Sequence, residues 1–377
     1  MDKATILLIM PTLFAGGAEK QYRYIMESLS ENYQVEVLLL NLPIQGQEAQ
    51  TVNYIKEHPL ICFHQLKGKV FQETQSGIIT KWRKVKALLL QWIWLKKRLS
   101  TKKIDIAMFS YVTQLLMVPL LGKHYVKTIF NERNTGRQIC DRNYKRILLN
   151  KCTRVISNSQ FAAEYITRCT GISVKVYNNG ICSDLISLEK HDGFNILIPA
   201  RINRIKNQMI LIQSLKQLEN EGVSSDLCVT LAGDIDDSAY ALELANEIKA
   251  NHLNVRIMGY VEKIKKLYAK SDLIVLPSLE EGTPNVILEA YLYGIRILAS
   301  DIPMNRNCAL DESVLFDPRD SNALSNLIKQ IINSEVDSEV EEKQKERNRK
   351  YVIDNYGLDA MKNRYTALFD SVYSQEK

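Results

Sequence analysis

The sequence lacks the cysteine and histidine patterns of a disulfide framework or a structural metal site. Its seven cysteines are an odd number without any Cys-x-x-Cys pair, and its five histidines are scattered. Closely spaced pairs are typical of zinc sites and of small disulfide-bonded domains. We therefore expect no bound metal and no disulfide framework, and we expect the chain to reside in a reducing cytoplasm.

Long apolar runs are also missing. Residues 106–122 form an uncharged stretch of 17 residues, whereas a helix needs about 20 mainly apolar residues to cross a bilayer. This stretch contains Ser110, Gln114 and Pro119, so we expect a buried strand followed by a helix. The apolar residues 4–10 are too few for a signal peptide and end without a small-residue cleavage site.

Charge is unevenly distributed along the 377 residues, a length that suits two domains. Residues 1–190 contain 27 Lys and Arg against 14 Asp and Glu, whereas the remaining residues contain 22 against 29. A basic N-terminal half beside an acidic C-terminal half indicates that one half meets an anionic surface.

The most informative stretch is residues 271–301, SDLIVLPSLEEGTPNVILEAYLYGIRILASD. Its pattern predicts a buried strand over 273–276, a loop, a helix and a second buried strand over 295–299. Thr283 is a suitable N-cap and Pro284 a suitable first helical residue, and Gly294 is expected to end the helix. These elements make one βαβ unit.

Two carboxylates lie where such a unit binds ligands, outside the carboxyl end of its first strand. Glu281 is in the loop, and Glu289 follows on the helix. The pair can accept hydrogen bonds from a polyol, while the helix N-terminus faces a phosphate with the backbone N–H groups of residues 283–286. The alternative is that both glutamates are merely solvated, as most charged residues are.

Two cations follow another expected strand, residues 194–199. Arg201 lies just beyond it, and Lys206 follows five residues later at the start of the next helix. An arginine fork and a lysine point charge that converge there would clamp a diphosphate. Two solvated basic residues are the alternative interpretation.

Taken together, these residues resemble the signature of glycosyltransferase family 4, the glycosyl transferases group 1, which are retaining two-domain enzymes of the GT-B type. The string EGTPNVILEA carries its Glu-x7-Glu motif, and Arg-x4-Lys resembles its diphosphate-binding pair. The resemblance implies that Arg201, Lys206 and Glu281 are catalytic, with Glu281 on the donor sugar and Glu289 on the ribose. It also implies donor contacts from Gly16, Gly17, Met258, Val261, Gly282, Thr283, Pro284, Asn285 and Val286.

The implied fold is α/β: two Rossmann-like, doubly wound parallel-sheet domains that face each other across a cleft. We expect an acceptor-binding domain over residues 1–190, with a glycine-rich loop at Gly16 and Gly17 after the first strand. A nucleotide-sugar-binding domain would occupy 191–357, and a terminal helix, 358–377, would pack back on the first domain. The Gly-x-Gly-x-x-Gly fingerprint of dinucleotide sites is absent.

The segment from Lys81 to Lys103 has nine basic and no acidic residues, with apolar residues that include Trp82 and Trp92. A basic helix with tryptophans is typical of an interfacial helix on an anionic membrane. A core helix with a solvated basic face is the alternative. Nucleic acid is not expected as a partner because no binding motif accompanies the charge.

The segment Asn131, Glu132, Arg133 follows an expected strand over 126–130, where a substrate-facing loop belongs. Many members of the family have a histidine near this position that contacts the sugar, and this chain has none. We expect a contact with the acceptor or the donor sugar from these three residues; an ordinary Glu132–Arg133 ion pair is the alternative.

The sequence therefore predicts a retaining, metal-independent glycosyltransferase without a cofactor, which moves a hexosyl or N-acetylhexosaminyl group from a nucleotide sugar, expected to be a UDP-sugar. The acceptor would be a glycan, expected on a polyprenyl diphosphate, in surface polysaccharide biosynthesis such as capsule or O-antigen. The enzyme would be cytoplasmic and peripheral on the inner face of the cell membrane. A GT-B sugar-nucleotide epimerase and a non-catalytic nucleotide-sugar-binding protein are the rival interpretations.

Overall fold

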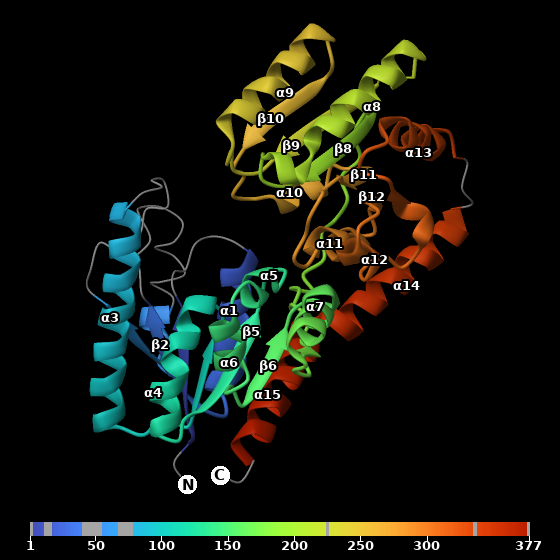
Figure 1. Ribbon diagram of the computed structural model, residues 1–377. Coiled ribbons are helices and arrows are strands. Elements are labelled where there is room, and N and C mark those ends of the chain that lie inside the picture. Colours follow the sequence, from blue (N-terminus) through green and yellow to red (C-terminus); the bar gives the residue numbers. More distant parts are fainter. Residues whose placement is uncertain are drawn as a thin grey trace. The chain divides into compact units, whose positions relative to one another are not determined.

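The computed structural model describes residues 3–10, 17–39, 55–66, 78–223, 226–334 and 338–374. The chain forms two compact units (Figure 1). The first contains residues 1–180 and 358–377, and the second contains residues 181–357. Each unit has its own parallel sheet and its own core, so each is described by itself.

The first unit is built on a seven-stranded parallel sheet in the order β3-β2-β1-β4-β5-β6-β7. The inner strands are short and almost wholly apolar because helices cover both faces of the sheet. The strands are β1 (Thr5–Met10), β2 (Gln34–Leu39), β3 (Ile61–Gln65), β4 (Ile106–Phe109), β5 (Lys127–Glu132), β6 (Arg154–Ser157) and β7 (Lys175–Val176).

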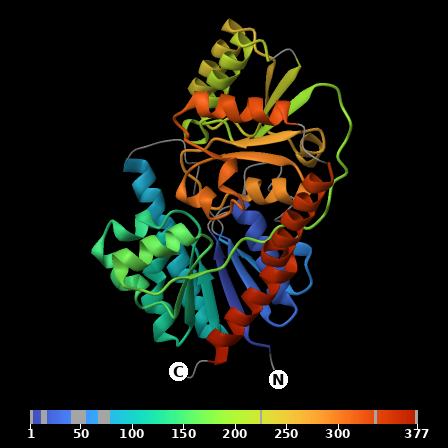
Figure 2. The same ribbon diagram turned by 90° about the vertical axis from the view of Figure 1, so that its right-hand side faces the viewer.

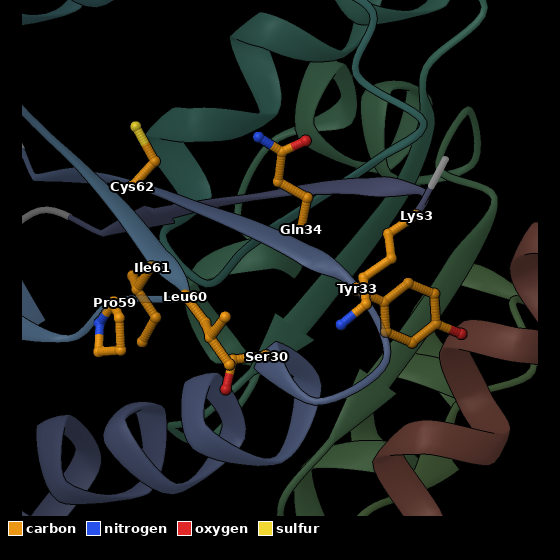
Figure 3. Close-up of a pocket in the computed structure, with 8 residues that line it drawn as sticks. All are labelled: Lys3, Ser30, Tyr33, Gln34, Pro59, Leu60, Ile61 and Cys62. Atoms are coloured by element: carbon orange, nitrogen blue, oxygen red, sulfur yellow. The ribbon is translucent and has the colours of Figure 1, made fainter. Parts of the chain in front are cut away.

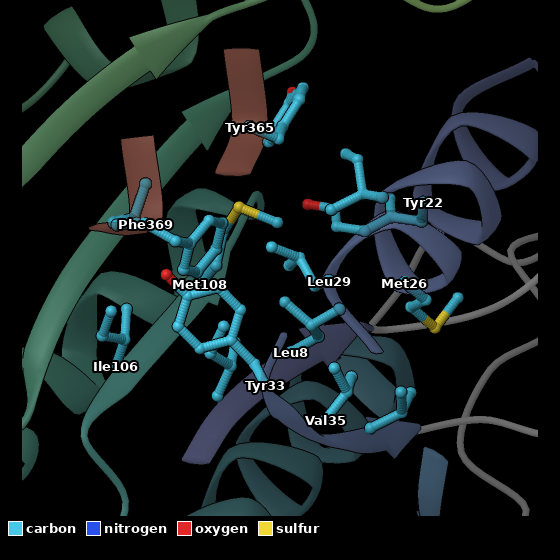
Figure 4. Close-up of a cluster of buried hydrophobic side chains, with 14 of the residues drawn as sticks. Leu8, Tyr22, Met26, Leu29, Tyr33, Val35, Ile106, Met108, Tyr365 and Phe369 are labelled. Atoms are coloured by element: carbon cyan, nitrogen blue, oxygen red, sulfur yellow. The ribbon is translucent and has the colours of Figure 1, made fainter. Parts of the chain in front are cut away.

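Two helices, α1 (Gly17–Ser30) and α15 (Leu358–Ser374), pack against each other on one face of this sheet. Figure 4 shows their side chains meeting those of the central strands, with Tyr365 and Phe369 of α15 beside Leu8, Leu29 and Met108. The other face is covered by α3 (Ile78–Thr101), η1 (Val112–Met117), α4 (Val118–Lys123), α5 (Arg137–Cys140), α6 (Asn143–Leu149) and α7 (Gln160–Thr170).

The uncharged stretch 106–122 folds as strand β4, then η1 and α4, as its polar residues predicted. Among the described residues, no helix is both long enough and apolar enough to cross a membrane.

Helix α3 is attached to the sheet through a buried ion pair. Nε of Arg98 donates to Oε2 of Glu36 on β2 at 2.9 Å, and Nη2 donates to the other carboxylate oxygen. Nε2 of His64 on β3 lies 3.2 Å from the same carboxylate. Glu36 and Arg98 are 2% and 9% exposed. Burial raises the pKa of Glu36, but hydrogen bonds from His64 and Arg98 outweigh it and lower the pKa to about 2.

The second unit has a six-stranded parallel sheet in the order β10-β9-β8-β11-β12-β13. Figure 2 shows its strands between α8 and α13 on one side and α11 on the other. The strands are β8 (Phe194–Pro199), β9 (Leu227–Ala232), β10 (Val255–Gly259), β11 (Leu273–Leu276), β12 (Arg296–Ser300) and β13 (Leu315–Phe316).

The helices of the second unit follow its strands in turn. Helix α14 packs along α11, and α13 packs along α8. They are η2 (Arg204–Lys206), α8 (Gln208–Asn220), α9 (Ser238–Ala250), α10 (Lys265–Tyr268), α11 (Asn285–Tyr293), α12 (Pro303–Arg306), η3 (Glu312–Val314), α13 (Ser321–Asn333) and α14 (Ser338–Tyr356).

The units divide at Gly180 rather than near residue 190. The chain from Cys182 to Gly193 has no helix or strand, yet this segment is bonded to the second unit. The N–H of Ile181 donates to the carbonyl of Tyr356 at 2.7 Å, and that of Glu189 to the carbonyl of Ala269 at 2.7 Å. The polar segment 188–193 is therefore part of the second unit because its backbone groups find their partners there.

Candidate functional site

The order of the second sheet reverses between β8 and β11, which are neighbours in space although β9 and β10 separate them in sequence. Helices cross to opposite faces from such a point, which leaves a crevice outside the carboxyl ends of the two strands. The chain after β8 carries Arg201 and Lys206, and the chain after β11 carries Glu281 and Glu289. The four residues with predicted roles therefore all follow strands that end at the same edge of one sheet.

Lys206 and Glu281 meet directly at this edge. Nζ of Lys206, the last residue of η2, lies 2.6 Å from Oε1 of Glu281. The two side chains are only 17% and 10% exposed. In partly buried surroundings, such a charged hydrogen bond is considerably stronger than at an open surface. Neither Lys206 nor Glu281 is therefore a freely solvated side chain in this structure.

Arg201 has a different partner. Its Nη1 lies 3.0 Å from Oδ2 of Asp236, in the turn after β9, and the arginine side chain is 63% exposed. In this structure both cations engage carboxylates of the chain itself. Since Arg201 is mostly solvated, its pair with Asp236 is weak, and the guanidinium is readily available to an anionic ligand.

Backbone contacts hold the two loops against each other. Asn207 adopts left-handed backbone angles, with φ 53°, and its Nδ2 donates to the carbonyls of Pro277 at 3.2 Å and Pro318 at 2.9 Å. The N–H of Leu279 donates to the carbonyl of Ile205 at 2.8 Å. These hydrogen bonds join the loops that carry Lys206 and Glu281, so both residues have defined positions.

Helix α11 begins later than the sequence predicted. Pro284 is its N-cap and Asn285 its first residue, so the expectation that Thr283 caps the helix is wrong. The carbonyl of Thr283 instead accepts the N–H of Asn285 at 2.9 Å, because the loop makes one more turn before the helix starts. The helix ends at Gly294 as predicted, with φ 72°.

Glu289 lies half-buried on α11, and Oη of Tyr268 donates to its Oε2 at 2.7 Å. Tyr268 itself is 1% exposed. Burial, and then the neighbouring Glu289, raise the pKa of Tyr268 well above its ordinary value. Its hydroxyl therefore stays protonated and donates to the carboxylate.

The predicted base contacts flank the end of β10. Met258 is half-exposed, and Val261 lies partly buried two residues beyond the strand, against the α11 side of the core. Within the described part of the chain, no group of three or more His, Cys, Asp or Glu side chains is arranged to bind a metal ion.

The second unit also matches a family model. Residues 185–351 match the model described as glycosyl transferases group 1. The match lies within the second unit and includes the charged pairs that follow β8 and β11.

Similarity to one curated enzyme extends over both units of the chain. The chain is 22% identical over 304 residues to an α-1,4-N-acetyl-D-galactosaminyltransferase of Campylobacter jejuni, whose acceptor is named as GalNAc-α-(1→4)-GalNAc-α-(1→3)-diNAcBac-PP-undecaprenol. The match covers 78% of this chain and 79% of that enzyme.

Solved structures show the same GT-B fold. A glycosyltransferase from Rickettsia africae superposes with a TM-score of 0.81 at 17% identity and covers 100% of both chains. The Anabaena protein Alr3699/HepE, solved with UDP and glucose, superposes with a TM-score of 0.77 at 17% identity, over 98% of this chain and 100% of that one. Both likenesses establish the fold of this chain.

In the first unit, the predicted glycine loop is only partly described. Gly16 lies outside the described residues, and Gly17 is the first residue of α1. Helix α1 is the next described element after β1, which is the order that a phosphate site at a helix N-terminus requires. The role of both glycines stays a prediction.

The segment 131–133 lies at the end of strand β5 rather than in the loop beyond it, and its predicted contact with a sugar stays a prediction. Asn131 and Glu132 are the last residues of β5, and all three residues are buried. Nη2 of Arg133 donates to Oδ1 of Asn179 at 2.6 Å, and Nδ2 of Asn131 lies 3.4 Å from Oη of Tyr365. These side chains are fixed within the unit because strand β5 runs two residues further than the apolar pattern.

Glu132 organises the turn that follows β5. Its Oε1 accepts the N–H of Asn134 at 2.7 Å. Burial raises the pKa of Glu132 above its ordinary value, although backbone N–H groups of the turn and the charge of Arg133 oppose that shift. Its first role is therefore to shape the turn.

A pocket of about 360 Å³ in the first unit lies away from these residues (Figure 3). Lys3 precedes β1, Gln34 begins β2 and Ile61 begins β3, so the pocket lies at the amino ends of the strands. Ligands of such sheets bind at the opposite edge, which excludes this pocket as the expected substrate site.

Two residues of the site escaped sequence reasoning. Asp236 and Tyr268 contact Arg201 and Glu289, yet an aspartate in a turn and a tyrosine in a short helix carry no distinctive signal. The only hint was that Asp236 follows the Gly-Asp turn after a buried strand.

Proposed function

We propose that this glycosyltransferase moves a hexosyl or N-acetylhexosaminyl group from a UDP-sugar to a glycan on a polyprenyl diphosphate, in surface polysaccharide biosynthesis. The observation that supports this most directly is the Lys206–Glu281 contact of 2.6 Å at the point where the strand order of the second sheet reverses. A cation for a diphosphate and a carboxylate for sugar hydroxyls lie side by side there, as a nucleotide sugar requires.

When the donor binds, Lys206 and Glu281 would each exchange the other for a group of the donor. Lys206 and Arg201 would turn to the diphosphate and stabilise the negative charge that grows as the glycosidic bond breaks, the electrostatic contribution expected to be largest. Glu281 would accept hydrogen bonds from the sugar, and Glu289 from the ribose. No residue is assigned as a covalent nucleophile.

The donor base and the acceptor are inferred from the similar proteins. The Anabaena structure contains UDP and glucose, and the Campylobacter enzyme acts on an undecaprenyl-diphosphate glycan. We propose the same ligand classes for this chain, together with retention of configuration and no requirement for a metal or another cofactor. The predicted residues Gly282, Thr283, Asn285 and Val286 would line the phosphate site with backbone N–H groups.

A lipid-linked acceptor places the enzyme at the inner face of the cell membrane, and α3 offers a surface for that contact. Leu89, Trp92 and Ile93 are exposed on this helix, interspersed with the exposed Lys86, Lys96 and Lys97. Nζ of Lys96 lies 6.0 Å from the ring centroid of Trp92. Apolar side chains that enter the headgroup region, beside lysines that meet anionic lipid, favour an interfacial helix.

The test is a transfer assay with a panel of UDP-sugars and a polyprenyl-diphosphate-linked glycan, with EDTA in one arm. We expect transfer from one donor, unaffected by EDTA, and a product whose anomeric configuration by NMR equals that of the donor. Isomerisation of the donor in the absence of acceptor would favour an epimerase instead, and binding without turnover would favour a non-catalytic protein.

A further inference from the structure

Tyr268 is a buried residue that lies behind the candidate donor site and contacts it through a hydrogen bond to Glu289. It is the last residue of α10, and its Oη lies 2.7 Å from Oε2 of Glu289 on α11. The tyrosine is 1% exposed, whereas Glu289 is half-buried. A group so deeply buried cannot meet a ligand itself, so any effect on the donor must pass through Glu289.

The ring of Tyr268 is fixed by packing on several sides. It stands edge-on to the ring of Tyr293, with centroids 5.2 Å apart and planes at 66°. It also belongs to the apolar core between the sheet and α11, together with Ile274, Leu276, Ile287 and Leu288. Closely packed side chains stay in single rotamers, so the position of the hydroxyl is defined before any ligand arrives.

A fixed donor matters for a glutamate because its long side chain samples many rotamers when free. A neutral phenol that donates to one carboxylate oxygen restricts those rotamers. It also satisfies one lone pair without adding a charge that would compete with the ligand. The carboxylate is thereby held in one orientation on the surface of α11.

We propose that Tyr268 is a positioning residue for donor binding: its hydroxyl orients the carboxylate of Glu289 toward the ribose hydroxyls of the nucleotide. This rests on the proposed function, in which Glu289 binds the ribose. Tyr268 contacts no part of the substrate.

The experiment compares two ligands on two variants. Calorimetric affinities for UDP and for its 2′,3′-dideoxy analogue are measured with the wild type and with Tyr268→Phe, which keeps the ring and removes only the hydroxyl. We expect about tenfold weaker binding of UDP, the loss typical of a hydrogen bond to a charged group. The analogue has no ribose hydroxyls for Glu289, so its affinity should change by less than about twofold.

Tyr291→Phe is the matched control. Tyr291 is a buried tyrosine on α11, the helix that carries Glu289, but its hydroxyl accepts the N–H of Leu310 at 3.0 Å. Removing it should change the affinities for the two ligands equally.

The outcomes distinguish a failure of the positioning role from a failure of the proposed function. Equal losses for both ligands in Tyr268→Phe would overturn the positioning role and leave a structural one. Unchanged UDP affinity in Tyr268→Phe, with a loss in Glu289→Gln, would overturn the inference and keep the proposed site. UDP binding that is absent in the wild type, or indifferent to Glu289→Gln, would overturn the proposed function together with this inference.

Discussion

Each unit contains a pair formed by a glutamate and a cation, buried in the first unit and largely buried in the second, but the two pairs differ in construction. In the first unit, Glu36 receives two hydrogen bonds from the fork of Arg98 and a contact from His64. In the second, Glu281 is paired with one amine, that of Lys206. The first pair joins α3 to β2 and β3, whereas the second lies at the carboxyl ends of β8 and β11.

The difference indicates which pair stabilises the fold and which binds a ligand. A planar arginine fork on a carboxylate has little freedom to leave, and both partners of the first pair are less than a tenth exposed. A lysine is a point charge on a flexible stem and can exchange one anion for another. We therefore expect substitutions in the first pair to reduce stability and those in the second to reduce activity.

The largest expected effect is on folding. Arg98→Met leaves Glu36 buried without its main partner, which costs about 3–5 kcal/mol of unfolding free energy. Urea denaturation followed by circular dichroism measures it. Because an apolar replacement of both partners removes the stranded charge, Glu36→Leu combined with Arg98→Met should recover part of the loss. A change below about 1 kcal/mol in the single variant would contradict the structural role.

The counterpart in the second unit is Lys206→Ala. Removing one preorganised cation from a developing negative charge lowers kcat by about 10²- to 10³-fold. Steady-state transfer with the donor found in the panel measures it, and thermal stability is expected to fall less than in Arg98→Met because this pair is less buried. The control is Lys216→Ala on α8, whose surface pair with Glu247, at 3.2 Å, should be dispensable. Near-normal turnover of Lys206→Ala would remove the lysine from the mechanism.

Low pH should reduce the stabilisation that the pair of Glu36 and Arg98 contributes. The pKa of Glu36 is lowered to about 2 from an ordinary 4.5, so the unfolded chain binds a proton here more readily than the folded one. The stabilisation is complete above about pH 5 and is lost as the pH falls toward 2, by roughly 3 kcal/mol. Unfolding free energies measured across that window should fall less steeply for Glu36→Gln, and parallel curves would refute the assignment.

A smaller effect is expected at the exposed face of α3. Replacing Trp92 and Ile93 together by Ala should weaken binding to vesicles that contain phosphatidylglycerol by about tenfold, because less apolar surface enters the interface. Co-sedimentation measures the bound fraction. Leu242→Ala, at an exposed leucine on α9, is the control. Binding that is indifferent to anionic lipid, or to the double substitution, would count against α3 as the contact.

The βαβ motif around β11 shows which structural features the sequence predicts correctly. Its strand, the end of its helix at Gly294 and the following strand were all predicted, because a short apolar run and a glycine at a left-handed position are local signals. The start of α11 was misplaced because a Thr-Pro pair suits either side of a helix start. Only the tertiary contacts of the loop decide between the two.

The candidate site was predicted as residues but not as pairs. Arg201, Lys206 and Glu281 were chosen from the motif, but their partners were not. Lys206 and Glu281 are separated by 75 positions in the chain, and no local pattern encodes such a distance. The prediction for residues 131–133 was wrong in their local structure. Their polar side chains indicated a loop, whereas the structure buries them beside α15.

The sequence by itself determined the class of fold and which residues are candidates for the site, because strand and helix periodicity and motif spacing are properties of neighbouring positions. Tertiary structure alone decided which charge faces which. It turned Arg98 inward to Glu36 while its neighbours Lys96 and Lys97 stayed exposed on the same helix. It also set Tyr268 behind Glu289. The free energy of a charge depends on the side chains that surround it, and only the folded chain brings those together.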